Sequence, residues 1–78
     1  MWFVYMLKCS DSTLYTGITT DLERRVKEHN SSDKGAKFTR SRRPVILVYS
    51  ERCSDRSSAS KREYAIKRLS RKKKLEML

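Results

Sequence analysis

Two neighbouring stretches decide the fold: Trp2–Leu7, which reads WFVYML, and Thr13–Ile18, which reads TLYTGI. Both are rich in aromatic and β-branched residues, which favour strands. The segment between them, Cys9–Ser12, is polar and typical of a turn. The start of the chain is therefore predicted to form a β-hairpin.

Two tyrosines, Tyr5 and Tyr15, stand out in this predicted hairpin. Side chains alternate across a strand, so pairing of Lys8 with Ser12 would place the two rings directly opposite each other on one face. A slip of one residue would separate them. Gly17 leaves the same face bare, so we expect room there for a ligand backbone. Simple packing of two aromatic rings is the alternative explanation.

Helices and one further strand are predicted in the rest of the chain. The signals are N-cap residues, apolar residues three or four apart, and a short apolar run after a proline. The expected elements are a helix over 21–29 with Thr20 or Asp21 as N-cap and Asn30 and Ser31 at its end, a polar loop over 30–43, a strand over 45–49 opened by Pro44, a helix over 57–69 and a short helix within 70–78.

This pattern predicts one domain over residues 1–78 with an α/β (α+β) sandwich fold. A small three-stranded, largely antiparallel sheet is flanked by two to three helices. The long connection before the third strand leaves the place of that strand in the sheet open. A chain of 78 residues buries a modest core, roughly 60% of its unfolded surface.

Basic residues are concentrated in the second part of the chain. Residues 1–33 contain four basic and five acidic side chains, whereas residues 34–78 contain fifteen and four, and the net charge is +10. This asymmetry indicates a polyanionic partner, and nucleic acid is the leading candidate. A solvated, solubilising surface is the alternative.

Several other classes of protein are excluded. The longest apolar run, at the start of the chain, is too short for a membrane span, and it lacks the charged lead and cleavage site of a signal peptide. The basic segments also lack the apolar face that membrane-surface helices need. Two cysteines, Cys9 and Cys53, are too few for a secreted disulfide scaffold. We therefore expect a cytoplasmic protein with no membrane contact.

The first predicted helix carries polar residues on or near its buried face. Leu22 and Val26 are four apart and face the core, and at 100° per residue His29 lies within their stripe and Arg25 at its edge. A guanidinium at a buried edge calls for an anion or an acceptor. The alternative for Arg25 is that its side chain simply covers apolar surface, and the alternative for His29 is an ordinary histidine at a helix end. The residues expected to point to solvent are Arg24, Lys27 and Glu28.

The second predicted helix carries one acid, Glu63, among many basic residues. Glu63 lies on the flank of the side that Ala59, Ala65, Ile66 and Leu69 would bury. A carboxylate leaning inward in a segment suited to phosphate repels that ligand unless a cation lies between them. Magnesium suits this role, because it binds through one or two carboxylates together with water and phosphate oxygens. An ordinary ion pair with Lys67 at i, i+4 is the alternative.

The order of four features along the chain resembles the GIY-YIG nuclease domain. These features are Tyr5, the triplet Tyr15-Thr16-Gly17, the stretch Leu22–His29 and the later Glu63. The resemblance covers nearly the whole chain and is closest to the small single-domain bacterial group typified by YhbQ. The chain departs from the family pattern at Phe3-Val4-Tyr5, where Gly-Ile-Tyr is usual, and at Thr16, where Ile is usual. It also lacks the asparagine that often follows the glutamate.

The resemblance implies a GIY-YIG fold and a metal-dependent endonuclease that hydrolyses DNA phosphodiesters in DNA processing or repair. It implies that Tyr5, Tyr15, Arg25 and Glu63 form the active site, with His29 beside them. Glu63 would bind one Mg²⁺ or Mn²⁺ ion, and either tyrosine could act on the attacking water. A module that keeps the fold and binds nucleic acid without cleaving it is the alternative.

The expected partner is nucleic acid, DNA rather than RNA, together with a possible protein partner that supplies targeting. A basic adaptor for an acidic protein would fit the charge but leave the tyrosines and Glu63 unexplained. The residues expected to contact nucleic acid are Gly17, Lys34, Lys37, Arg40, Arg42, Arg43 and Lys67.

Overall fold

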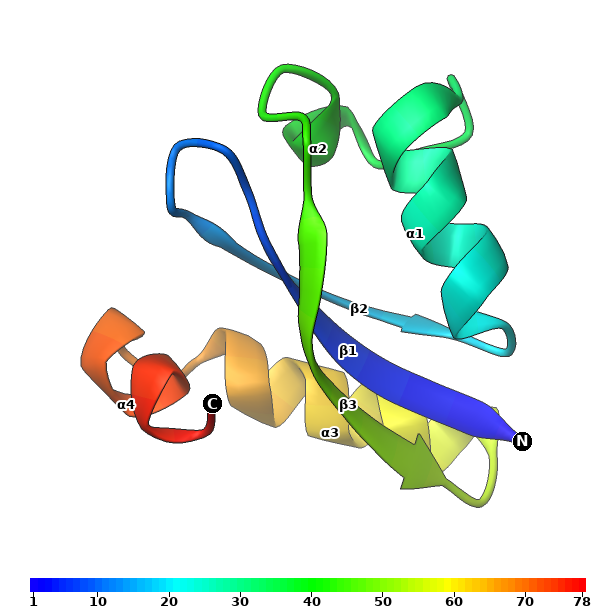
Figure 1. The fold of residues 1–78 in the computed structure, drawn as a ribbon. Coiled ribbons are helices and arrows are strands. Elements are labelled where there is room, and N and C mark those ends of the chain that lie inside the picture. The colour runs from blue at the N-terminus through cyan, green and yellow to red at the C-terminus, as the bar shows by residue number, and fades with distance from the viewer.

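A three-stranded antiparallel sheet forms the centre of the molecule, and helices lie on both of its faces (Figure 1). The computed structural model describes residues 1–78. The predicted fold class is confirmed, with four helices in place of the two to three expected. In chain order the elements are β1 (Trp2–Lys8), β2 (Leu14–Thr19), α1 (Leu22–Ser31), α2 (Lys37–Arg40), β3 (Ile46–Cys53), α3 (Arg56–Lys67) and α4 (Arg71–Glu76).

Strand β1 is the middle strand, in the order β2-β1-β3. Its residues Val4–Leu7 are all buried, as expected for a strand covered on both faces. This places the third strand, whose position the sequence left open, beside β1. Helices α1 and α2 lie on one side of the sheet, and α3 and α4 lie on the other (Figure 1).

The alternation of side chains along β1 creates two small cores. Val4 and Met6 pack on one face against Ala59 and Ile66 of α3. Tyr5 and Leu7 pack on the opposite face, in a cluster that also holds Cys9, Val45, Tyr15, Leu22 and Val26. Tyr5 is therefore part of the hydrophobic core on this face of the sheet.

The register of the hairpin differs from the predicted one by two residues. Lys8 pairs with Leu14, so Tyr5 lies opposite Gly17 and not opposite Tyr15. The turn is longer than expected because the Asp11 carboxylate accepts hydrogen bonds from both the amide and the hydroxyl of Thr13, at 3.1 and 2.6 Å. A shift of two residues keeps both tyrosines on one face, since the side-chain period is two.

Helix α1 runs two residues further than predicted, and one of its side chains joins it to the residue directly before β3. Asp21 is the N-cap, and its carboxylate accepts from the amide of Arg24 at 3.1 Å. Asn30 lies inside the helix and not at its end. Its amide donates to the Val45 carbonyl at 2.9 Å and accepts from the Val45 amide at 2.7 Å, as a neighbouring strand would.

The second half of the chain also differs in detail from the prediction. The segment expected to be a loop over 30–43 contains the helical turn α2, and β3 extends to Cys53. Asp55 caps α3 by accepting from the Ser58 amide at 2.7 Å, so α3 starts and ends slightly earlier than expected. Ala65 is exposed, so its predicted place on the buried side is wrong. None of the helices is both long and apolar enough to cross a membrane.

Thr16 provides a test of this packing, because its hydroxyl oxygen is buried and has no hydrogen-bond partner. Replacing it with valine keeps the shape and removes an unpaired polar atom. We expect Thr16→Val to raise the free energy of unfolding by about 1 kcal/mol, measured by urea denaturation with an unchanged m-value. A loss of stability would show that the hydroxyl has a partner in solution.

Candidate active site

Tyr5 lies at the centre of the candidate site. Its side chain is buried, and its hydroxyl lies 2.8 Å from Nε2 of His29. Its ring covers Gly17, where an added Cβ would lie 2.5 Å from the Tyr5 hydroxyl oxygen. The glycine is therefore needed for the tyrosine ring, and the expectation that Gly17 leaves room for a ligand backbone is wrong.

His29 is completely buried and is held at both ring nitrogens. The Thr39 hydroxyl donates to the Ala36 carbonyl at 2.8 Å, so its oxygen can accept from Nδ1–H of His29 at 3.0 Å. This tautomer satisfies the two shorter contacts and leaves Nε2 as an acceptor for the Tyr5 hydroxyl. It does not use the longer contact of 3.3 Å between the Ala36 amide and Nδ1.

The electrostatic surroundings keep His29 neutral. Burial, followed by the positive charges of Arg25 and Arg43, lowers its pKa to about 4, while Glu28 acts weakly in the opposite direction. At neutral pH the ring is therefore an uncharged hydrogen-bond acceptor toward Tyr5.

An aromatic cluster extends the site toward the surface. The ring centre of Tyr15 lies 6.4 Å from that of Tyr5 and 5.2 Å from that of His29. Phe38 of α2 stacks on Tyr15 at 5.8 Å, and the Arg42 guanidinium lies 4.0 Å from the Phe38 ring centre. Phe38 was not predicted as a site residue, although it is the only aromatic residue among the basic residues 34–43.

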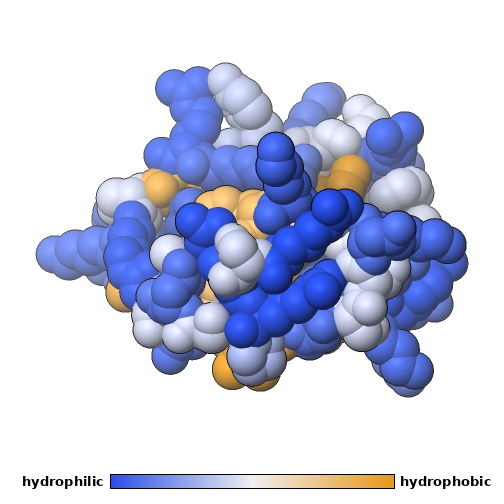
Figure 2. Space-filling model, turned by 90° about the horizontal axis from the view of Figure 1, so that it is seen from above, coloured by the Kyte–Doolittle hydropathy of each residue, from blue (hydrophilic) through white to orange (hydrophobic).

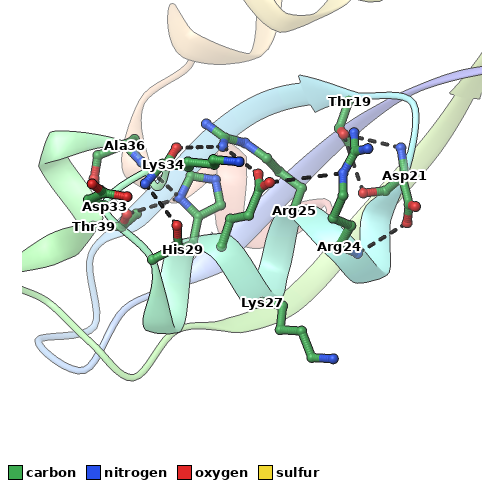
Figure 3. A network of polar contacts seen from close by, with 12 residues as sticks. Thr19, Asp21, Arg24, Arg25, Lys27, His29, Asp33, Lys34, Ala36 and Thr39 are labelled. Atoms are coloured by element: carbon green, nitrogen blue, oxygen red, sulfur yellow. Dashed lines mark hydrogen bonds and ion pairs between the residues drawn. The ribbon is translucent and has the colours of Figure 1, made fainter.

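Arg25 is turned toward the site from α1. Its Nη1 donates to Glu28 Oε1 at 2.9 Å and to the Lys34 carbonyl at 2.8 Å. Figure 3 shows Arg25 extending along the helix toward Lys34, while Lys27 points away from this network. Glu28 is half-buried in this pair, so its predicted orientation to solvent is wrong. The predicted position of Arg25 at the edge of the buried stripe agrees with its partial exposure of 26%.

The pKa of Tyr5 identifies the neighbours of its hydroxyl. Burial first, and then Tyr15, raise this pKa to about 12; the hydrogen bond and charge of Arg25 lower it, and Glu63 adds a smaller increase. Groups from β2, α1 and α3 therefore act on one phenol, although they are far apart in the sequence. At neutral pH Tyr5 is protonated.

Glu63 is a half-buried carboxylate on α3, and its Oε2 lies 3.3 Å from Nζ of Lys67. The i, i+4 ion pair that was the alternative explanation is thus formed. No group of three His, Cys, Asp or Glu side chains could hold a metal ion between them. A single carboxylate nevertheless fits a Mg²⁺ or Mn²⁺ ion whose remaining ligands are water and phosphate oxygens.

The predicted nucleic-acid contacts differ in how far their side chains are already bonded within the protein. Lys34, Lys37 and Arg40 are exposed near α2, and Nη2 of Arg40 donates to the Asp33 carbonyl. Arg42 pairs with Asp11 at 3.0 Å, and Lys67 pairs with Glu63.

Arg43 has a structural role that the sequence did not predict. Its guanidinium is directed at main-chain carbonyls at the end of α1, and Nε donates to the carbonyl of His29 at 2.6 Å. It therefore caps the end of α1 through Nε and Nη2.

The fold, the clustered tyrosines and histidine beside Arg25, and the glutamate on α3 are the features expected of a GIY-YIG-type domain. The family model described as the GIY-YIG catalytic domain matches residues 1–76, so the chain belongs to this family. Among curated relatives, a UPF0213 protein of Desulfotalea psychrophila is 72% identical to this chain. The matched region covers 88% of this chain and 63% of that relative. One from Staphylococcus haemolyticus is 54% identical over 97% of this chain and 92% of its own length.

Solved structures agree with this assignment. The solution NMR structure of a UPF0213 protein from Bacillus halodurans has a TM-score of 0.61 and 47% identity, covering 97% of this chain and 81% of that one. A protein from E. faecalis, also solved by NMR, has a TM-score of 0.61 and 45% identity, covering 95% of this chain and 79% of that one. The names of these relatives give a family and no activity.

The buried, neutral His29 predicts a pH-dependent stability. Its folded pKa is about 4, whereas an unfolded histidine takes up a proton near pH 6.5, so stability is lost as the pH falls between these values. We expect the free energy of unfolding to fall by roughly 2 kcal/mol from pH 7 to pH 5, measured by urea denaturation. His29 is the only histidine, so His29→Gln should remove this slope; equal slopes in both proteins would contradict the assignment.

Proposed function

We propose that this protein is a metal-dependent nuclease that hydrolyses phosphodiester bonds of DNA. The observation that carries the proposal is the 2.8 Å hydrogen bond between the Tyr5 hydroxyl and Nε2 of His29. It lies beside Arg25 and within the electrostatic reach of Glu63. Membership of the GIY-YIG family supports the same reaction class.

Arg25 has the properties needed to bind the reacting phosphate. Its Nη1 is fixed by Glu28 and Lys34, which orients the guanidinium and leaves further N–H groups for phosphate oxygens. Positive charge held at these oxygens stabilises the transition state, in which negative charge develops around phosphorus. The anchoring of Arg25 lowers the cost of ordering it on binding.

Tyr5 and His29 together can take the proton of the attacking water. The Tyr5 oxygen accepts that proton while its own phenolic proton passes to Nε2 of His29. The water oxygen bonds to phosphorus, the bond to the leaving oxygen breaks, and that oxygen takes a proton from solvent. The negative charge of a bound phosphate offsets Arg25, one of the charges that lower the pKa of His29. This geometry favours Tyr5 over Tyr15 as the group that acts on water.

Glu63 would hold the divalent metal, Mg²⁺ or Mn²⁺. When bound, such an ion supplies positive charge that stabilises the leaving oxygen. Glu63 would exchange its ion pair with Lys67 for this ion, and the lysine would then be free to contact the nucleic-acid backbone.

The second candidate function is nucleic-acid binding without turnover. Two observations favour it: Glu63 already has a cationic partner, and the pKa of Tyr5 is high in the free protein. Both candidates use the same basic surface, so the presence of cleavage distinguishes them.

The biological setting is part of this proposal. DNA is preferred to RNA on the family resemblance, with a role in DNA processing or repair and a protein partner for targeting. Both cysteines, Cys9 and Cys53, are free thiols, which supports a reducing, cytoplasmic setting.

Nicking of supercoiled plasmid in Mn²⁺ or Mg²⁺ tests the proposed reaction. Glu63→Gln keeps the shape of the side chain and removes its charge, and we expect it to lower the nicking rate by about 100-fold or more. Arg25→Lys keeps one charge but loses the guanidinium fork, and a similar loss is expected. Affinity for DNA, measured in EDTA, should change by less than fivefold or so in both variants, because most backbone contacts remain.

The matched control is Glu76→Gln, which removes an exposed carboxylate of α4. It should nick at the rate of the unchanged protein. Nicking by Glu63→Gln at that rate, or nicking that persists in EDTA, would contradict the metal role. Tight DNA binding without nicking in either metal would favour the second candidate function.

A further inference from the structure

A groove lies beside the candidate site, and Arg25 is the only residue of its lining that takes part in the reaction described above. It encloses about 320 Å³ and runs along the end of β2 to the first residues of α1 and α3. Its lining includes Trp2, Thr19, Thr20, Arg24, Arg25 and Arg56. Arg25 belongs both to this groove and to the candidate active site.

The groove carries more positive than negative charge. Three guanidinium groups line it together with one carboxylate, that of Glu28. Glu28 is 2.9 Å from Arg25 but 4.0 Å from Arg24. Arg56 forms no ion pair, and its guanidinium carbon lies 5.8 Å from the centre of the Trp2 ring.

Two arginines outside the groove are paired with acids. Arg42 pairs with Asp11, and Arg62 pairs with Glu51, both at 3.0 Å. Arginines gathered at one concave place with too few acids repel one another unless an anion joins them. The arrangement therefore points to a ligand with negative charge.

The orientation of Arg24 agrees with this interpretation. Figure 3 shows Arg24 near Thr19, while Lys27 of the same helix points away from this network. The face that carries α1 and α2 is covered largely by hydrophilic side chains, with small hydrophobic areas between them (Figure 2). Trp2, half-buried in the groove, adds an apolar wall.

We propose that this groove binds a second phosphate of the nucleic-acid strand, next to the one that reacts. Arg24 and Arg56 would contact its oxygens, and the attached nucleoside would lie against Trp2. The inference rests on the proposed function and deepens it, because it assigns a backbone subsite to residues that take no part in proton transfer. A phosphate is bound well by guanidinium groups, which donate two hydrogen bonds at once, and a nucleoside packs against an aromatic ring. The groove has both kinds of group.

The sole tryptophan makes this subsite directly measurable. A twelve-nucleotide thymidine oligomer is titrated into the protein in EDTA, so that no strand is cut, and the fluorescence of Trp2 is recorded. We expect a saturable change in emission. Arg24→Ala and Arg56→Ala should each weaken binding about five- to tenfold and reduce the slope of log K against log salt by about 0.7.

Arg71→Ala is the charge-matched control, because Arg71 is exposed on α4 and does not line the groove. It should lower the affinity less than twofold and leave the change in Trp2 emission intact. Thermal unfolding of all three variants shows whether they remain folded. Losses in the groove variants no larger than that of Arg71→Ala would overturn the proposal. So would oligomer binding, seen by anisotropy of a labelled strand, with no change in Trp2 emission.

The two proposals fail in different ways. If the groove variants lose affinity while the unchanged protein does not nick plasmid with any metal, the subsite stands and the nuclease proposal falls. If nicking depends on Glu63 but Arg24→Ala and Arg56→Ala bind as Arg71→Ala does, the nuclease proposal stands and the subsite is wrong.

Discussion

The hydrogen bond between Tyr5 and His29 is the constraint on which the rest of the site depends. It joins the middle strand of the sheet to α1 through a buried contact of 2.8 Å. Tyr5 reaches His29 only because Gly17, its partner on β2, has no side chain in the way. Gly35 has a similar role, because a Cβ there would lie 2.7 Å from the Glu28 carbonyl oxygen, so the segment before α2 can approach α1 closely. The two glycines thus allow three elements to meet around one phenol.

Charge is distributed around this centre in a way that suits a phosphate ligand. The pKa of His29 is lowered and the pKa of Tyr5 is raised, so both groups are neutral in the free protein at neutral pH. The nearby positive charge comes from Arg25 and the groove arginines, and in the free protein it is only partly balanced by Glu28. A bound phosphodiester would supply the missing negative charge. Binding and preparation of the proton-transfer pair are therefore expected to be linked.

The sequence predicts the fold class and most of the elements, because apolar alternation and capping residues are local signals. The strand and helix periods also place Tyr5 and Tyr15 on one face of the hairpin and put His29 and Arg25 at the buried side of their helix. That these groups meet in one site follows from the family resemblance. The hairpin register could not be predicted from the sequence, because two hydrogen bonds to Asp11 set the turn. The structural role of Arg43 could not be predicted either, because charge alone does not distinguish a helix cap from a phosphate contact. Phe38 and the groove residues depend on tertiary contacts that no local pattern shows.

The most direct test is the nitrogen-15 NMR spectrum of the His29 ring, recorded between pH 5 and 8. A buried ring with a pKa of about 4 should remain neutral over this range, with the proton on Nδ1 and with Nε2 as the acceptor. Tyr5→Phe should shift the Nε2 resonance, because it removes the hydroxyl that contacts this atom. Protonation of the ring with a midpoint near pH 6.5, or an Nε2 signal unchanged in Tyr5→Phe, would contradict the account.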